Sequence, residues 1–212
     1  MGQKLPTEAA LSKRFGVNRH TVRRAIAAMG EQDLVHSRRG AGVFVTQIPT
    51  EYPIGQRVRF HKNLQAAGRI PAKEILAMET RCADTFEADA LGLCVGDMVH
   101  AYKGLSRADG QPIAMFRSVF PAHCFPGLPA ELERHLSVTK ALRVFGINDY
   151  TRSSTRLNAT SANATQALHL QVREGAPLLR TIAVNIDPDG KPIEYGTSWF
   201  VGDRVTLTIA DT

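Results

Sequence analysis

The chain has 212 residues, of which 43% are hydrophobic and 22% are charged, a composition typical of a folded globular protein. No run approaches the roughly 18 apolar residues of a transmembrane helix. The first residues, MGQKLPTE, lack the apolar segment of a secretory signal, so we expect a cytoplasmic protein with no membrane partner. The three cysteines are far apart and the sequence has no metal-ligand spacing or glycine-rich phosphate loop, so we expect neither a metal nor a cofactor.

The net charge of +6 is distributed unevenly along the chain. Residues 1–46 hold eight basic and three acidic side chains, a net charge of +5, whereas residues 47–212 hold 18 basic and 17 acidic ones. A basic excess confined to the first fifth of a chain indicates contact with nucleic acid or another anionic surface.

The basic segment has the pattern of a helix-turn-helix. Thr7 is placed to cap a short helix, EAALSKRF, which ends at Gly16. Asn18 is placed to cap a second helix that starts at about Arg19 and ends near Gly30. Its apolar residues at i, i+4 and i+7 form an inward face (Val22, Ile26 and Met29). Its basic residues form an outward face near the helix start (Arg19, His20, Arg23 and Arg24).

The next segment, VHSRRGAGVFV, predicts two short strands around a basic, glycine-rich tip at Arg38, Arg39 and Gly40. A helix-turn-helix followed by such a hairpin is a winged helix, which is a more specific signal than either part alone. The alternative is a solvated charged helix next to an ordinary hairpin.

The segment from LPTEAALSKRFGVNRHTVRRAI to DLVHSRRGAGVFV resembles the winged helix of GntR-type bacterial transcription regulators. This resemblance implies a list of residues that contact the operator: Asn18, Arg19, His20, Thr21, Arg23, Arg39 and Gly40. Arg38 and Arg39 would reach the adjacent minor groove or the DNA backbone. Arg19 and Arg23 suit guanine edges in the major groove, whereas Asn18 and Thr21 suit phosphates. The family has an additional helix before LPTE, and this chain starts four residues before that motif. We therefore expect a winged helix without its first helix.

Residues 47–60 carry two prolines and a glycine and predict a linker between a DNA-binding domain (1–46) and a second domain (61–212). The second domain contains a repeat, because ADALGLCVGDMV is echoed by TQALHLQVREGAPLL. The two copies continue to Asp109-Gly110 and Asp189-Gly190, which predict hairpin turns. A repeated helix and hairpin predicts an α+β fold, an antiparallel sheet with helices, and a cleft where the halves meet.

Residues 60–210 resemble the UTRA effector-binding domain of the HutC subfamily of GntR regulators, whose fold is related to chorismate lyase. The motifs ADGQPI, FPAHCFPGL, DYTRSSTRL and PIEYGTSWFVGDRVTL are most similar to PhnF-type regulators of phosphonate metabolism. The resemblance also implies that Glu194 occupies an effector-contact position.

The segment NDYTRSSTRLNA predicts a strand in which Tyr150, Arg152, Ser154 and Arg156 share one face. Two arginines beside a hydroxyl and a phenol suit a phosphate or phosphonate through charge-assisted hydrogen bonds. The alternative is a strand face that contacts only solvent.

The other candidate effector residues come from the two hairpins. We expect Arg107 and Arg117 to lie opposite each other in the first hairpin and to add positive charge to the cleft. Tyr195 and Trp199 are candidate cleft walls in the second hairpin, although a tryptophan in such a strand is more often part of the core.

These features predict a ligand-responsive transcription regulator, a repressor of the phosphonate-metabolism type. It would bind a pseudo-palindromic operator in double-stranded DNA as a homodimer, and an effector in the second domain would modulate that binding. One alternative is a lyase-like enzyme, although the sequence shows no nucleophile and base pair. Another is a ligand-binding protein of the same fold without effective DNA binding.

Overall fold

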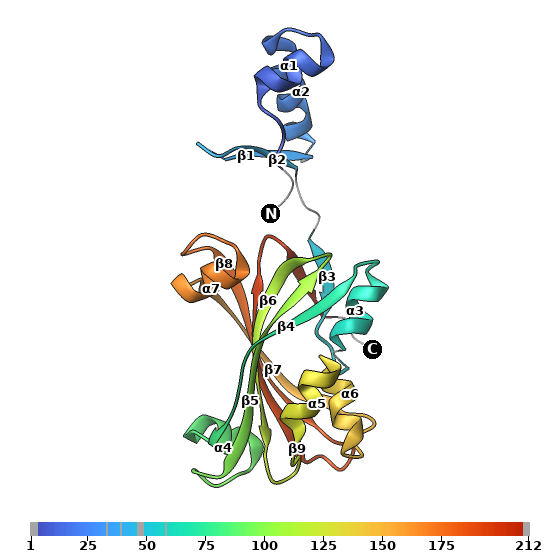
Figure 1. Cartoon of the computed structure of the whole chain (residues 1–212), viewed down its shortest axis with the longest axis vertical. Helices are drawn as coiled ribbons and strands as arrows, with labels where there is room; N and C mark the ends of the chain where they lie inside the picture. Colours follow the sequence, from blue (N-terminus) through green and yellow to red (C-terminus); the bar gives the residue numbers. More distant parts are fainter. Residues whose placement is uncertain (1–3, 33, 39, 46–48, 58, 210–212) are drawn as a thin grey trace. The chain divides into compact units, whose positions relative to one another are not determined.

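The computed structural model describes residues 4–32, 34–38, 40–45, 49–57 and 59–209, except for the side chain of Arg38 (Figure 1). The chain divides into two compact units, residues 1–48 and 49–212.

The first unit is a helix-turn-helix followed by a hairpin. Its elements are α1 (Glu8–Phe15), α2 (Arg19–Glu31), β1 (Val35–Arg38) and β2 (Gly42–Val45). The Thr7 hydroxyl accepts a hydrogen bond from the Ala10 amide and starts α1, and Gly16 ends that helix with a φ of 64°. Val22 on the inner face of α2 is 6% exposed. The predicted pair of helices is confirmed.

The hairpin of the first unit pairs β1 with β2 in an antiparallel register that runs from Val35 opposite Val45 to Arg38 opposite Gly42. The chain start adds to this small sheet, because Lys4 bridges to Phe44 and the Leu5 amide donates to the Val43 carbonyl. This is the wing that the sequence predicts.

The second unit is built on a six-stranded antiparallel sheet in the order β4-β5-β6-β9-β8-β7. Its strands are β4 (Pro71–Cys82), β5 (Met98–Ala108), β6 (Gln111–Pro121), β7 (Thr151–Ser161), β8 (Pro177–Ile186) and β9 (Pro192–Val201), and a separate parallel pair consists of β3 (Thr50–Pro53) and β10 (Val205–Thr208). The helices are α3 (Phe60–Ala66), α4 (Thr85–Leu91), α5 (Leu128–His135), α6 (Val138–Val144) and α7 (Ala164–Leu170).

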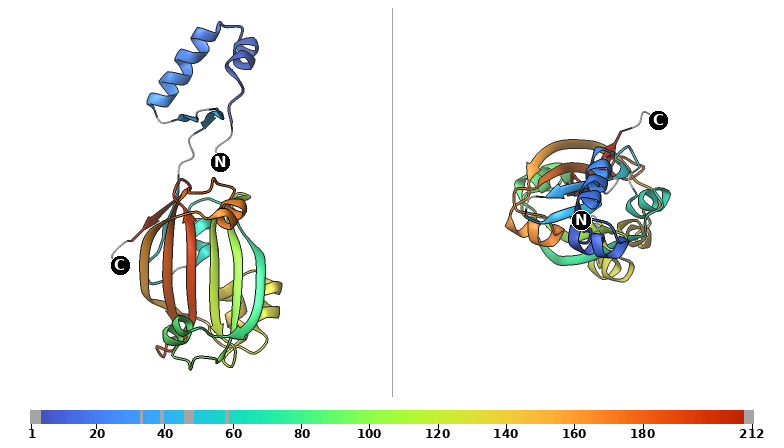
Figure 2. Two further views of the ribbon diagram at one scale, coloured as in Figure 1. Left: turned by 90° about the vertical axis from the view of Figure 1, so that its left-hand side faces the viewer. Right: turned by 90° about the horizontal axis from the view of Figure 1, so that it is seen from above.

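The repeat seen in the sequence is a structural repeat. The elements β4, α4, β5 and β6 form one half, and β7, α7, β8 and β9 form the other. Both short helices start with a capping box, Asp84 with Glu87 in α4 and Asn163 with Gln166 in α7. The halves meet where β6 pairs with β9. In Figures 1 and 2, α4 and α7 lie against one face of the sheet, and α3, α5 and α6 lie on the other.

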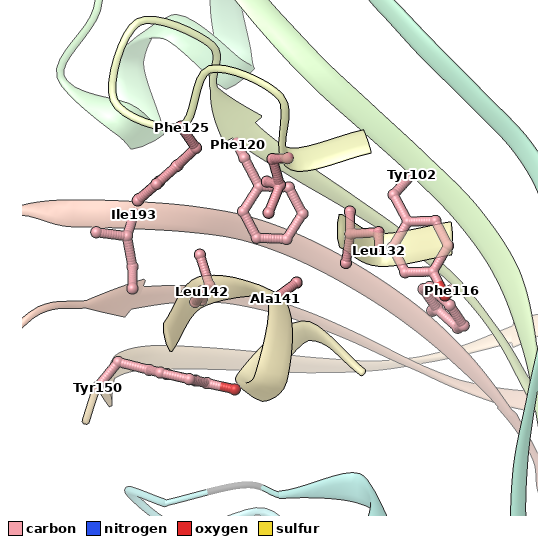
Figure 3. Close-up of a cluster of buried hydrophobic side chains, with 10 residues drawn as sticks. Tyr102, Phe116, Phe120, Phe125, Leu132, Ala141, Leu142, Tyr150 and Ile193 are labelled. Carbon is pink, nitrogen blue, oxygen red and sulfur yellow. The ribbon is translucent and has the colours of Figure 1, made fainter. Parts of the chain in front are cut away.

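The largest core cluster fills the space between the sheet and helices α5 and α6 (Figure 3). Phe120, Leu132 and Leu142 are each 0% exposed there. Tyr150 lies beneath α6, and its hydroxyl is 2.9 Å from the Thr139 hydroxyl in the first turn of that helix. Burial of these apolar side chains fixes α5 and α6 over one end of the sheet face.

The expectation of a linker over residues 47–60 is wrong from residue 50 onwards. Thr50–Pro53 form strand β3, which pairs in parallel with β10 near the end of the chain. Tyr52 and Ile54 are 4% and 6% exposed, because they pack into an apolar cluster with Phe200. Residues 46–48 lie outside the described part.

None of the helices in the described part of the chain is long and apolar enough to cross a membrane.

Gly104 provides a test of the packing between β4 and β5. A Cβ atom at this position would lie 2.4 Å from the Glu74 carbonyl oxygen and 2.7 Å from Cζ of Phe116. We expect Gly104→Ala to destabilise the second unit by about 1–3 kcal/mol through overpacking, which lowers the melting temperature by several degrees. Gly55→Ala, where a Cβ meets nothing within 4 Å, is the control. An unchanged melting temperature in the Gly104 variant, measured by calorimetry, would contradict this close approach.

Candidate DNA-binding surface and ligand cavity

The start of α2 presents exposed basic side chains. Asn18 caps the helix, because its Oδ1 accepts from the Thr21 amide at 2.8 Å and from the Thr21 hydroxyl at 3.0 Å. This cap fixes the first turn, from which Arg19 and His20 project into solvent. Backbone amides and exposed cations at a helix start favour a bound anion.

Arg23 lies one turn further along α2 and forms a two-pronged ion pair with Glu8 of α1. Its Nε and Nη2 donate to the two carboxylate oxygens at 3.2 and 2.9 Å. These hydrogen bonds hold the pKa of Glu8 below its ordinary value. Both side chains are exposed, so the pair is weak enough to be exchanged for contacts with DNA.

The other predicted DNA contacts belong to the wing. Arg38 is the last residue of β1, and Gly40 has the positive φ of 74° that the tight reversal requires. Arg39 and the side chain of Arg38 lie outside the described residues. The structure therefore contains both α2, the second helix of the helix-turn-helix, and the wing. The individual DNA contacts stay predictions.

The second unit contains a cavity of about 550 Å³ on the sheet face that α3, α5 and α6 cover. Its lining comes from both halves of the repeat, which is where the sequence places a cleft. The charged and histidine side chains in its lining are Arg59, His61, Lys62, Lys73, His135, Lys140, Arg143, Asp149, Arg152 and Glu194. Cations outnumber carboxylates in this set, so the cavity has a positive potential that favours an anionic ligand.

Arg152, Asn185 and Glu194 form one row across the strands β7, β8 and β9, because Arg152 pairs with Asn185 and Asn185 pairs with Glu194. The Asn185 amide donates to Glu194 Oε2 at 2.7 Å and accepts from Arg152 Nε at 3.5 Å. Within the described residues the terminal nitrogens Nη1 and Nη2 of Arg152 have no partner. They are available for a two-pronged contact with an oxyanion.

Lys73 of β4 is a second available cation in the cavity. Its ammonium lies 4.1 Å from the ring centre of Phe116 and 5.1 Å from that of Phe60. It forms no hydrogen bond or ion pair with the part of the chain that the structure describes. Burial lowers the pKa of Lys73 to about 8, and the charge of Glu194 acts in the opposite direction.

Arg59 and Tyr150 form a further wall of the cavity. The Arg59 guanidinium stacks 3.6 Å from the ring centre of Tyr150 and donates to Asp149 and to the Tyr150 carbonyl. Asp149 also pairs with Arg57 at 2.7 Å. These arginines therefore neutralise Asp149 and fix Tyr150 at the cavity edge.

The prediction that four residues of β7 share the cavity face is wrong for two of them. Ser153 is an extra residue in the strand, because the register shifts between Arg152 and Ser154. Tyr150 and Arg152 line the cavity, but Ser154 and Arg156 are opposite Val184 and Ile182 on the other face and are exposed. A strand bulge is not visible in a regular alternation of residues.

Arg107 and Arg117 do not lie opposite each other and do not line the cavity. Arg117 is opposite Lys103, and its side chain pairs with the buried Glu87 of α4. Arg107 is opposite Pro112, and its side chain pairs with Glu74 at 2.7 Å. Both guanidinium groups pair with carboxylates within their own half of the repeat, and neither is part of the cavity lining.

Tyr195 and Trp199 are also outside the cavity. They alternate with Glu194 and Ser198 along β9 and therefore face the helices α4 and α7. Tyr195 packs beside Val119 and Ala88, and Trp199 packs against the cluster around Leu105. Tyr195, predicted as an effector residue, therefore does not line the cavity, whereas Glu194 does.

The cavity is also lined by three residues that the sequence pattern does not predict there, Lys73, Arg59 and Tyr52. Arg59 and Tyr52 fall in the segment interpreted as a linker. Lys73 stands near the start of β4, where a single lysine in an alternating strand is typical of an exposed face. The only sequence signal for these cavity residues is the presence of basic and aromatic residues in the segment interpreted as a linker.

Among the described residues, no group of three His, Cys, Asp or Glu side chains is arranged to hold a metal ion. The cavity lining contains arginines, lysines and the buried carboxylate of Glu194, which are groups that can recognise a charged ligand.

Comparison with known proteins identifies the family. Residues 1–45 match the family of bacterial regulatory proteins called gntR, and residues 66–206 match the UTRA domain. The chain belongs to the GntR family, with a UTRA domain. This confirms the winged helix followed by an antiparallel sheet domain with helices.

Relatives extend over almost the whole chain. An uncharacterized HTH-type transcriptional regulator from Rhizobium meliloti is 37% identical over 97% of this chain and 84% of its own length. The probable transcriptional regulator PhnF of Escherichia coli is 33% identical over 98% of this chain and 86% of its own length. The crystal structure of PhnF from Mycobacterium smegmatis has a TM-score of 0.74 and 26% identity, and covers 100% of this chain and 93% of that one.

The chain is therefore a PhnF-like transcriptional regulator of the GntR/HutC type and not an enzyme, as the sequence predicts. GntR regulators bind DNA operators, and UTRA domains bind small-molecule effectors. Several relatives, including the PhnF of Mycolicibacterium smegmatis, are named repressors.

The lowered pKa of Lys73 predicts a pH-dependent effect of Lys73→Met on stability. Because the folded pKa of about 8 lies below the ordinary 10.5, the unfolded chain binds more protons between these values and stability rises with pH there. We expect Lys73→Met to raise the melting temperature at pH 7 by about 2–4 °C, the shift for about 1 kcal/mol. The advantage should shrink between pH 8 and 10. Lys103→Met, on the exposed side of β5, is the control; a Lys73→Met effect that does not change with pH would contradict the assignment.

Proposed function

We propose that this protein is a ligand-responsive repressor of the phosphonate-metabolism type, which binds a pseudo-palindromic operator as a homodimer. Its effector is a small oxyanion of the phosphate or phosphonate class, bound in the cavity of the second unit. Binding of the effector lowers the affinity of the dimer for DNA, because it shifts the population between two dimer geometries. We expect the protein to act in the cytoplasm, where it can bind both DNA and such metabolites.

The observation that supports the anionic effector is the pair of available cations in one cavity. Arg152 offers two terminal nitrogens, and Lys73 offers an ammonium that no protein carboxylate contacts within the described residues. A guanidinium fork matches the geometry of a tetrahedral oxyanion. The size of the cavity lies in the usual range for small-molecule sites.

Part of the cavity wall comes from residues that are close in sequence to the junction between the two units. Tyr52 lines the cavity, and it belongs to β3, the first described element after the junction at residue 48. Phe60 and Arg59, also in the wall, follow in the same segment. A ligand that contacts these residues acts on the stretch of chain that joins the two units.

The anion site can be tested by isothermal titration of the full chain with methylphosphonate. We expect Arg152→Gln to weaken binding about tenfold or more, because hydrogen bonds to a charged group contribute about 1.5–3 kcal/mol. Arg156→Gln removes the same charge from the opposite sheet face and should bind as the original chain does. The proposal fails if neither methylphosphonate nor inorganic phosphate binds, or if both variants lose affinity equally.

The DNA surface can be tested with a duplex selected for binding from a random pool. We expect the selected sequences to be pseudo-palindromic, and methylphosphonate to weaken the complex in a fluorescence anisotropy titration. Arg19→Ala should reduce affinity about tenfold, because a good arginine contact to a base contributes about 1–3 kcal/mol. Arg173→Ala, an equal change of charge on the exposed surface of the second unit, should have little effect. Equal loss in both variants would indicate only a general charge effect.

A further inference from the structure

Glu194 is a buried carboxylate that forms no ion pair within the part of the chain that the structure describes. It is 8% exposed, and its Oε2 accepts one hydrogen bond from Asn185. Its Oε1 accepts none from the residues that the structure describes. Since an ionised carboxylate is costly to bury unless it is paired, this group points to a partner that comes from outside the protein.

Glu87, in the same domain, shows how a buried carboxylate is satisfied by the protein itself. It is 0% exposed, and its two oxygens are held by Arg81 and Arg117. The Asp84 amide donates a further hydrogen bond to it. Glu194 lacks such a set of cations, although it is almost as deeply buried.

None of the cations that line the cavity forms an ion pair with Glu194 among the described residues. Arg59 is engaged by Asp149 and stacks on Tyr150. Lys73 lies against the rings of Phe60 and Phe116, and no ion pair joins it to Glu194. The side chain of Arg152 reaches Asn185, which separates it from Glu194.

The spacing of the row Arg152–Asn185–Glu194 sets the length of the ligand. The three residues are neighbours across three adjacent strands, so the backbones of Arg152 and Glu194 are two strand spacings apart, about 10 Å. Both side chains project into the same cavity, and the width of one amide group separates their polar atoms. A cationic group and an anionic group on one short spacer match this arrangement.

We propose that the effector is a zwitterion, in which Arg152 and Lys73 bind a tetrahedral oxyanion while Glu194 accepts hydrogen bonds from a protonated amine. This inference rests on the proposed function for its anionic end and adds the cationic end. A site built around a buried acceptor rejects an analogue that lacks the donor, because the acceptor is then left unsatisfied. Glu194 is therefore a specificity-determining residue for an aminoalkyl phosphonate or aminoalkyl phosphate.

The test compares three probes by isothermal titration with the full chain: 2-aminoethylphosphonate, ethylphosphonate and ethanolamine. We expect 2-aminoethylphosphonate to bind about tenfold or more tightly than ethylphosphonate, and ethanolamine to bind weakly. This comparison needs no variant, so it does not depend on whether a substituted chain folds.

Glu194→Gln should remove the preference for the amine while ethylphosphonate binds at least as well as before. Glu174→Gln, on the exposed surface, is the matched control. Equal affinities of the original chain for the two phosphonates would overturn the zwitterion and leave the anion site intact. Failure of both phosphonates to bind would instead overturn the proposed function, and a Glu194→Gln variant that keeps the amine preference would exclude Glu194 as the recognition group.

Discussion

The pairing of β6 with β9 is the constraint on which the second unit depends. It joins the two halves of the repeat into one antiparallel sheet, with Phe116 opposite Ser198 and Ser118 opposite Gly196. Because alternate residues of a strand face the same way, this pairing places side chains of both halves on the floor of one cavity. The alternate residues of β6 and β9 face the opposite side of the sheet, towards α4 and α7. A shift of one residue in this register would exchange the two sets.

The elements that could be predicted from the sequence are those specified by local signals. Capping residues and glycines defined the two helices of the first unit, and Asp109-Gly110 defined a turn in which both residues have positive φ. The repeat of a helix and a hairpin was enough to predict the antiparallel sheet and the cleft. In each case the information lies within a few neighbouring residues of the chain.

The errors come from interactions that local signals do not contain. The linker was predicted from its prolines and glycine, but β3 is held by β10, whose residues lie about 150 positions further along the chain. The bulge at Ser153 moved Arg156 away from the cavity and kept Arg152 in it. Arg117 looked like a free cation, but a carboxylate from α4 reaches it across the sheet face. Only long-range packing decides these contacts.

The distribution of satisfied charges connects the cavity with regulation. Elsewhere in the domain, several arginines pair with carboxylates, as in Arg69 with Asp109 and Arg107 with Glu74. In the cavity, Arg152, Lys73 and Glu194 remain without ion pairs among the described residues. Keeping these charges partly desolvated and unmatched raises the free energy of the empty domain. Under the proposed function, a ligand with complementary charges gains affinity by relieving that cost, and it binds beside Tyr52 of β3, the first described strand after the residues of the winged-helix unit. Under the proposed function, the same few residues therefore serve both as the recognition site and as the start of the response.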